Sequence, residues 1–189
     1  MTNCSTRYIL GIDPGTKETA YCLCKVDNTT AGNKPPLSII TFCKTENENT
    51  KKFLYETLRK IDNDENTELV VAIEHLESYG TAVGKSTFET GYFIGQLQEV
   101  CFTYTLSNPN VAMKRIYRHE EKMRICHSMK ANDATIKQAL VDMFADHPEK
   151  NHGKGTKAEP DFFYGMKADC WSAFAICYTE WDRENGLPC

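Results

Sequence analysis

The chain lacks long hydrophobic runs. Its 189 residues are 41% hydrophobic and 25% charged, and no stretch approaches the roughly 20 apolar residues that a membrane-spanning helix needs. The first ten residues, MTNCSTRYIL, lack the basic segment and apolar core of a secretory signal. We therefore expect one soluble domain over residues 1–189, located in the cytoplasm, with no membrane partner.

Cysteine is not scarce, but the usual cysteine-based motifs are absent. The nine cysteines are odd in number and scattered, which does not indicate a disulfide framework. Cys22 and Cys24 form the closest pair, and alternation along a strand would place both on one face. With no CxxC or HxxxH motif beside them, small buried hydrophobic residues are favoured over a zinc site.

Acidic residues outnumber basic ones overall, but one segment has an excess of basic residues. The net charge of −4 argues against indiscriminate binding to nucleic acid. Residues 113–130, MKRIYRHEEKMRICHSMK, nevertheless carry a charge of +4. The charge results from two acidic residues, Glu120 and Glu121, and six basic ones: Lys114, Arg115, Arg118, Lys122, Arg124 and Lys130. Such a basic strip either binds phosphate groups or forms an ordinary solvated surface, and composition leaves both open.

Hydrophobic periodicity predicts an α/β fold with helices layered on a mixed sheet. Three strands at 8–12, 19–26 and 37–42 are expected to form an antiparallel meander, followed by a helix at 50–63 and a buried strand at 68–76. Further on we expect a helix at 86–101, strands at 100–107 and 112–120, and helices at 132–147 and 167–185. Residues 147–165 are polar and rich in turn formers, which predicts a flexible loop.

Three acidic residues stand at the ends of these elements. Asp13 ends the first strand just before Pro-Gly, Glu74 ends the buried strand, and Asp169 lies at the start of the last helix. Each alone has a structural interpretation, as a turn cap, an ion-pair partner or a helix-dipole partner. Gathered at one sheet edge they would repel one another unless cations lay between them, and carboxylate oxygens select Mg²⁺ or Mn²⁺. Two such ions support in-line displacement at a phosphodiester, so the set indicates a nuclease site.

Several stretches resemble one known family. In order, ILGIDPGTKETAYC, VVAIEHLESYG and KADCWSAFAIC resemble the first motif, the second acidic strand and the last acid-bearing helix of RuvC-like Holliday junction resolvases, members of the RNase H-like superfamily. SYGTAVGKSTFETGYFIGQ, RICHSMKANDATIKQALVDMF and DFFYGMKADCWSAFAI further resemble the divergent RuvC-like proteins of phages and prophages. The resemblance covers residues 8–180.

The resemblance implies an RNase H-like fold, with a central mixed five-stranded sheet flanked by helices. It also implies an endonuclease that uses Mg²⁺, replaceable by Mn²⁺ and bound as two ions, to cut branched DNA such as four-way junctions. The implied protein is a homodimer without a nucleotide cofactor, found in the cytoplasm of a bacterium or of a phage-infected host.

The resemblance also implies roles for individual residues. The family's metal-binding acids match Asp13, Glu74 and Asp169, and a fourth family acid falls where this chain has Ser172. Ser172 itself, through a bound water, or another acid such as Glu77 or Asp161 is left as a substitute.

The resemblance also implies that certain basic and aromatic residues contact DNA. Lys122 matches a family lysine in a strand before the third helix and is assigned to phosphate contact or charge stabilisation. A second family lysine corresponds to Ala134 here. The expected DNA contacts are Tyr79, Lys114, Arg115, Arg118, Arg124 and Lys130, with Tyr79 either stacking on an unpaired base or packing within its loop.

Three other functions remain for comparison. A non-catalytic binder of branched DNA on the same fold is kept open by Ser172. An actin-type or hexokinase-type ATPase shares the Gly-Ile-Asp-x-Gly pattern but needs a second such hairpin, and none follows residue 20. A transposase or integrase core would carry a further DNA-binding domain, for which we expect no room in this chain.

Overall fold

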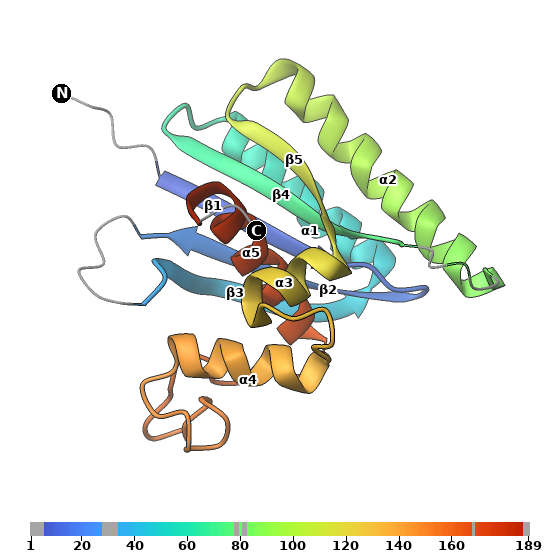
Figure 1. Cartoon of the computed structure of the whole chain (residues 1–189). Coiled ribbons are helices and arrows are strands. Elements are labelled where there is room, and N and C mark those ends of the chain that lie inside the picture. Colours follow the sequence, from blue (N-terminus) through green and yellow to red (C-terminus); the bar gives the residue numbers. More distant parts are fainter. Residues whose placement is uncertain (1–5, 28–33, 78–79, 81–82, 168, 187–189) are drawn as a thin grey trace.

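The structure, a computed structural model, describes residues 6–27, 34–77, 80, 83–167 and 169–186. Within these residues the chain forms a five-stranded sheet in the order β3-β2-β1-β4-β5, covered by helices on both faces (Figure 1). The α/β class and the mixed five-stranded sheet that the sequence predicts are thereby confirmed.

The sheet combines an antiparallel and a parallel half. The first half is the predicted meander of β1 (Thr6–Asp13), β2 (Glu18–Val26) and β3 (Leu37–Glu46). On the other side of β1, β4 (Thr67–His75) and β5 (Val111–Tyr117) add in parallel. β4 is apolar over most of its length because it has a strand on each side and helices above and below.

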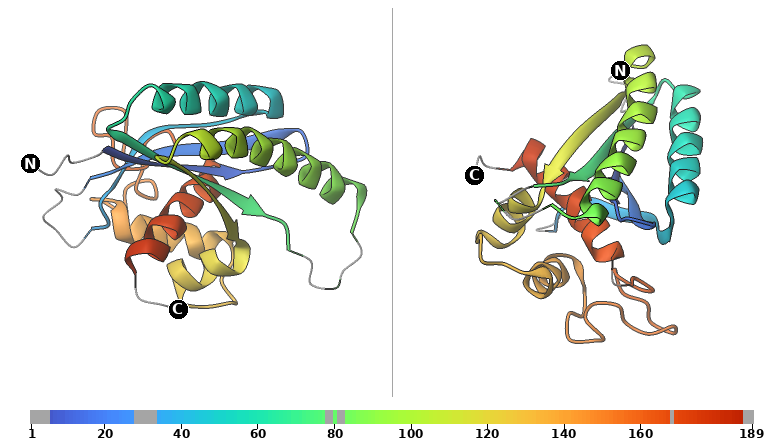
Figure 2. Two further views of the ribbon diagram at one scale, coloured as in Figure 1. Left: turned by 90° about the horizontal axis from the view of Figure 1, so that it is seen from above. Right: turned by 90° about the vertical axis from the view of Figure 1, so that its right-hand side faces the viewer.

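Different helices cover the two faces of the sheet (Figure 2). One face is covered by α1 (Asn47–Asp62) and α2 (Lys85–Ser107), and the other by α3 (Arg118–Cys126), α4 (Asp133–Phe144) and α5 (Cys170–Asn185). Each face has its own hydrophobic core. None of the described helices combines the length and the apolar character that a membrane crossing requires.

The strand expected at 100–107 is wrong, because these residues continue α2 to Ser107. Cys101 is buried and Tyr104 packs against the same core, whereas Phe102 and Leu106 point to solvent. This helical spacing is masked in the sequence by the strand-forming aromatic and β-branched residues of VCFTYTLS.

The strand expected at 112–120 is too long. β5 ends at Tyr117 and α3 begins at Arg118, where the Glu120 carboxylate accepts a hydrogen bond of 2.8 Å from the Tyr117 N–H and caps the helix. Lys122 therefore lies in α3 and not in a strand, and the lysine on β5 is Lys114.

Gly11 allows α5 to pack directly on β1. A Cβ atom at Gly11 would lie 2.2 Å from the carbonyl oxygen of Ala173 and 2.8 Å from the Cys177 sulfur. Asp169 precedes Ala173 by about one helical turn, so this contact brings the start of α5 to the end of β1.

The segment between α4 and α5 is anchored to the rest of the domain. The Asp161 carboxylate accepts hydrogen bonds from the backbone N–H groups of Asp146 at 3.0 Å, His147 at 2.8 Å and Phe162 at 2.7 Å. Phe163 is fully buried, with its ring centroid 4.4 Å from that of Trp171. The flexibility expected for residues 147–165 stays a prediction.

Candidate functional site

Two of the three predicted acids lie side by side at the ends of neighbouring strands. β1 and β4 are parallel with Ile12 aligned with Ile73, so Asp13 and Glu74 leave the sheet at the same edge. The two carboxyl groups are hydrogen-bonded to each other. Burial, followed by repulsion from Glu74, raises the pKa of Asp13 to about 8. With no cation between them, ionisation of both carboxyl groups is therefore unfavourable.

The third acid, Asp169, lies at the N-terminus of α5. It is close enough to Asp13 for its charge to contribute to the raised pKa of Asp13. Its Oδ2 atom lies 2.5 Å from the Nζ atom of Lys44 on β3, which also lies 3.3 Å from a Glu18 carboxylate oxygen. Sequence reasoning missed Lys44, because the third strand was expected to end at residue 42 and no motif surrounds this lysine.

A fourth acid, Glu121 on α3, was also missed. Its side chain is fully buried, it forms an ion pair with Arg118, and its Oε1 atom has no hydrogen-bond partner. Burial raises the pKa of Glu121 to about 7, and the charge of Asp13 adds to the rise. Burial and then the charge of Glu121 raise the pKa of Glu74. Glu121 therefore interacts electrostatically with the acidic site. Sequence reasoning missed this role because it considered Glu121 only as one of the acidic residues within the basic segment 113–130.

Arg118 is the cation among these acids. Its guanidinium pairs with Glu121 and with Asp133 at the start of α4. Its positive charge also opposes the rise in the pKa values of Asp13 and Glu74. Arg118 was predicted as a DNA contact, and its side chain is 25% exposed.

The donor set fits a hard divalent cation. Carboxylate oxygens are the ligands that Mg²⁺ and Mn²⁺ prefer, and the buried Glu121 Oε1 atom has lost its hydration without gaining a partner. In the described part of the chain, no three acidic residues each bring a carboxylate oxygen within 4.8 Å of the others. Asp13 and Glu74 are thus in contact, and no third carboxylate among the described residues joins them at that distance, in keeping with the mutual repulsion of the acids.

A cavity of about 480 Å³ opens beside Asp169. Arg118 of α3, Lys137 of α4, Lys154 of the segment before α5, and Ser172 of α5 contribute to its walls. Ser172, the residue at the place of the fourth family acid, therefore lines the space next to the acids.

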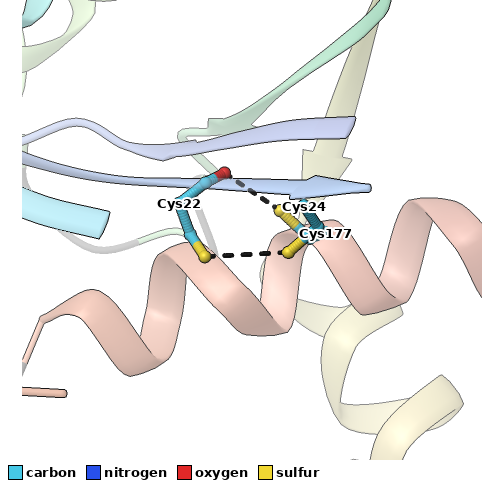
Figure 3. A group of neighbouring side chains, drawn as sticks. All are labelled: Cys22, Cys24 and Cys177. Carbon is cyan, nitrogen blue, oxygen red and sulfur yellow. Dashed lines mark hydrogen bonds between the residues drawn. The ribbon is translucent and has the colours of Figure 1, made fainter. Parts of the chain in front are cut away.

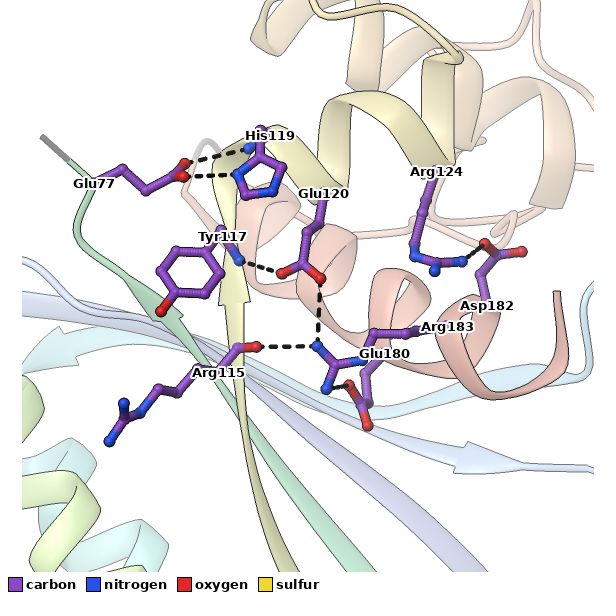
Figure 4. Close-up of polar contacts among 9 residues, drawn as sticks. All are labelled: Glu77, Arg115, Tyr117, His119, Glu120, Arg124, Glu180, Asp182 and Arg183. Carbon is purple, nitrogen blue, oxygen red and sulfur yellow. Dashed lines mark hydrogen bonds and ion pairs between the residues drawn. The ribbon is translucent and has the colours of Figure 1, made fainter. Parts of the chain in front are cut away.

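The two other acids considered as substitutes are engaged elsewhere. Glu77 Oε1 lies 2.6 Å from His119 Nδ1 (Figure 4). Asp161 caps the backbone of the segment before α5, as described above.

The side chains of the basic strip differ in their exposure. Arg124 points to α5, where it lies 2.9 Å from Asp182 with a side chain only 11% exposed (Figure 4). Of the other predicted contacts, Arg115 and Lys130 are exposed, Lys114 and Lys122 are half-buried, and Tyr79 lies outside the described residues. The structure thus brings Arg118 to the acids and directs Arg124 to a structural ion pair.

The paired cysteines on β2 pack against α5 (Figure 3). The sulfur atoms of Cys22 and Cys24 are 3.7 Å apart, and the Cys177 thiol donates a hydrogen bond of 3.2 Å to the Cys22 carbonyl. All three sulfurs lie within 4.8 Å of one another, and all three side chains are fully buried. Burial raises the pKa values of Cys22 and Cys24 well above the ordinary value. Hydrogen bonds from these two thiols and from the Gly11 N–H instead lower the pKa of Cys177. The burial and raised pKa values of Cys22 and Cys24 support the interpretation of these two residues as small buried hydrophobic residues.

Comparison with known proteins gives similarity in structure alone. No protein-family model matches the chain, and no curated protein matches its sequence. The structure of Thermus thermophilus RuvC has a TM-score of 0.62 at 14% identity, covering 95% of this chain and 96% of that one. T. thermophilus RuvC in complex with a Holliday junction substrate has a TM-score of 0.58 at 12% identity, with the same two coverages of 95% and 96%.

A third solved structure, the yeast mitochondrial Holliday junction resolvase Ydc2, has a TM-score of 0.52 at 11% identity over 93% of this chain and 79% of that one. The likeness to phage and prophage proteins stays a prediction. The chain has the RNase H-like fold of RuvC and Ydc2, which confirms the fold that the sequence resemblance implied.

Proposed function

We propose that this protein is a structure-selective endonuclease that hydrolyses phosphodiester bonds in branched DNA, four-way junctions included. The observation that carries the proposal is the convergence of Asp13 and Glu74, at the ends of parallel strands, with Asp169 at the start of α5. The proposal is supported by similarity along 95% of the chain to T. thermophilus RuvC, which has been solved in complex with a Holliday junction substrate.

The acidic residues are assigned to metal binding. Asp13, Glu74 and Asp169 would hold Mg²⁺, or Mn²⁺ in its place, as two ions, and Glu121 would supply a further carboxylate. Bound divalent ions stabilise the charge on the attacking and leaving oxygens of a phosphodiester. The protein's part is to fix these carboxylates: strand pairing sets Asp13 beside Glu74, and the Arg118 ion pair orients Glu121.

DNA contacts are assigned to the basic residues that remain accessible. Arg115 and Lys130 are exposed, and Lys122 and Lys114 retain part of their side chains at the surface. Their charges would contact phosphate groups and set orientation on the DNA, without reading the sequence of bases.

A homodimer is proposed through α2. Phe88, Tyr92, Phe102 and Leu106 are exposed on this helix, at 70%, 73%, 54% and 72%. Together with the exposed Gly95 and Glu99 they recur at alternating spacings of four and three residues, the period with which two helices pack along a seam. Exposed apolar residues aligned on one face mark an interaction surface, and a second copy offers the same seam.

A second candidate function, a binder of branched DNA that does not cleave it, is favoured by the ion pairs of the acids. Lys44 neutralises Asp169, Arg118 neutralises Glu121, and Ser172 stands at the place of an acid. These internal cations compete with metal for the same carboxylates.

Cleavage of a synthetic four-way junction tests the proposal. The protein is incubated with the junction or a matched linear duplex in Mg²⁺, Mn²⁺ or EDTA, and products are resolved on a denaturing gel. We expect metal-dependent, symmetric nicks in the junction alone. Asp13→Asn should reduce cleavage by about a thousandfold or more while junction binding persists, because it removes a charge with little change in volume.

Asp142→Asn, at an exposed position on α4, serves as the matched control and should cleave like the parent. Cleavage by Asp13→Asn at the parental rate would contradict the assigned site. Binding by the parent without cleavage in either metal would favour the non-cleaving binder.

A further inference from the structure

The cavity beside Asp169 is lined by three cationic side chains and by two acidic ones, Asp133 and Asp169. Three cationic side chains reach it from three separate parts of the chain: Arg118 from α3, Lys137 from α4 and Lys154 from the segment before α5. Arg118 is committed to Glu121 and Asp133. Among the residues that the structure describes, neither lysine forms an ion pair with a carboxylate.

Lys137 is held in place by an aromatic ring. Its Nζ atom lies 4.9 Å from the centroid of the Trp171 ring. Trp171 is itself buried and packs against Phe163, with 4.4 Å between centroids. A cation–π contact orients an ammonium group without neutralising its charge. Lys137 is therefore positioned to meet an anion that enters the cavity.

Lys154 is held by the backbone around it. Its carbonyl oxygen accepts a hydrogen bond of 3.1 Å from the Asp161 N–H, and the neighbouring Gly153 carbonyl accepts one of 3.0 Å from the Phe163 N–H. Gly153 has a φ of +69°, and a Cβ atom there would lie 2.6 Å from the Ala145 Cβ atom. The backbone beside Lys154 thus packs against Ala145 at the end of α4 and against Phe163. Phe163 is the residue that packs on Trp171, the ring that contacts Lys137.

We propose that Lys137 and Lys154 form a phosphate subsite, which holds the DNA backbone next to the phosphodiester that is cleaved at the acids. This inference rests on the proposed function, and it assigns the cavity to the nucleotide next to the cleaved phosphodiester. The cavity volume of about 480 Å³ suits a small anionic unit such as one nucleotide. Asp169 and Ser172 line the same cavity, so a strand in it passes directly beside the acidic site. Both lysines are positioning residues.

Junction binding measured over a range of salt concentrations tests the subsite. Fluorescence anisotropy of a labelled four-way junction in EDTA is compared for the parent, Lys137→Gln, Lys154→Gln and the double variant. Each lost phosphate contact should lower the slope of log K against log[salt] by about 1, and the double variant by about 2. Lys154→Arg should restore the slope, because it keeps the charge.

Lys52→Gln is the matched control, since Lys52 is exposed on α1, on the opposite face of the sheet. Thermal melting of every variant checks that the fold is retained. If the parent binds the junction and the double variant has the slope of Lys52→Gln, the subsite is wrong and the proposed function stands. If the parent binds neither junction nor duplex, the proposed function and the subsite both fail.

Discussion

Glu180 is a buried carboxylate that should make the stability of this domain depend on pH. Its side chain is fully buried in α5, and Arg183 lies 3.0 Å from its Oε2 atom (Figure 4). Burial raises the pKa of Glu180 to about 7, and the charge of Glu184 adds to the rise. The folded state therefore keeps this proton at pH values where the unfolded chain has lost it. This group's contribution to stability falls as pH rises from about 4.5 to about 7.

Glu180→Gln should make stability less dependent on pH. Between pH 5 and pH 8, titration of Glu180 should lower the unfolding free energy of the parent by about 2 kcal/mol. The amide of Glu180→Gln does not titrate, so the variant should not show this decrease. Urea unfolding of both proteins at the two pH values measures the difference. Glu56→Gln, exposed on α1, should follow the parent. Equal pH dependence of Glu180→Gln and parent would show that Glu180 is not responsible.

At the scale of elements, the contact of α5 with β1 positions the third acid. It depends on Gly11, because the atom that a Cβ would meet at 2.2 Å is a backbone oxygen, which cannot rotate away. Gly11→Ala should therefore lower the unfolding free energy by about 1–3 kcal/mol. The same displacement of α5 should reduce cleavage, since Asp169 moves with it.

Gly95→Ala gives the matched comparison, because within one protomer a Cβ atom at this position in α2 meets nothing within 4 Å. A glycine in a helix interior costs about 0.5–1 kcal/mol relative to alanine, so this variant should be more stable than the parent. Both are measured by urea unfolding at one protein concentration. A Gly11→Ala protein as stable as Gly95→Ala would contradict the close packing of α5.

At the scale of the whole molecule, the exposed seam of α2 predicts the assembly. Phe102→Glu combined with Leu106→Glu should convert a dimer to a monomer, because four charges would face one another across a two-fold interface. Both side chains are exposed, at 54% and 72%, so the fold should persist. Light scattering after size exclusion measures the mass, and circular dichroism checks the fold.

Ile40→Glu is the control for this assembly, since Ile40 is 53% exposed on β3, away from α2. It should remain a dimer. A parent that is monomeric at the concentrations used for cleavage would contradict the assigned surface.

Much of the fold was predictable because its signals are local. Apolar runs and turn residues specify β1 and β4, and Asn132 caps α4 by accepting a hydrogen bond of 3.0 Å from the Thr135 N–H. The errors at 100–107 and 112–120 arose where strand-forming residues lie on helices. There the burial of Cys101 and the cap by Glu120 outweigh local propensity.

The sequence by itself determined the α/β class and the positions of Asp13, Glu74 and Asp169 at the ends of their elements, because hydrophobic periodicity encodes where strands and helices stop. Only the tertiary structure decided which distant residues join them. Lys44, Glu121 and the two cavity lysines come from other elements, and their meeting depends on how α3, α4 and α5 pack on the sheet. That packing follows from contacts such as the one at Gly11, which join residues more than 150 positions apart.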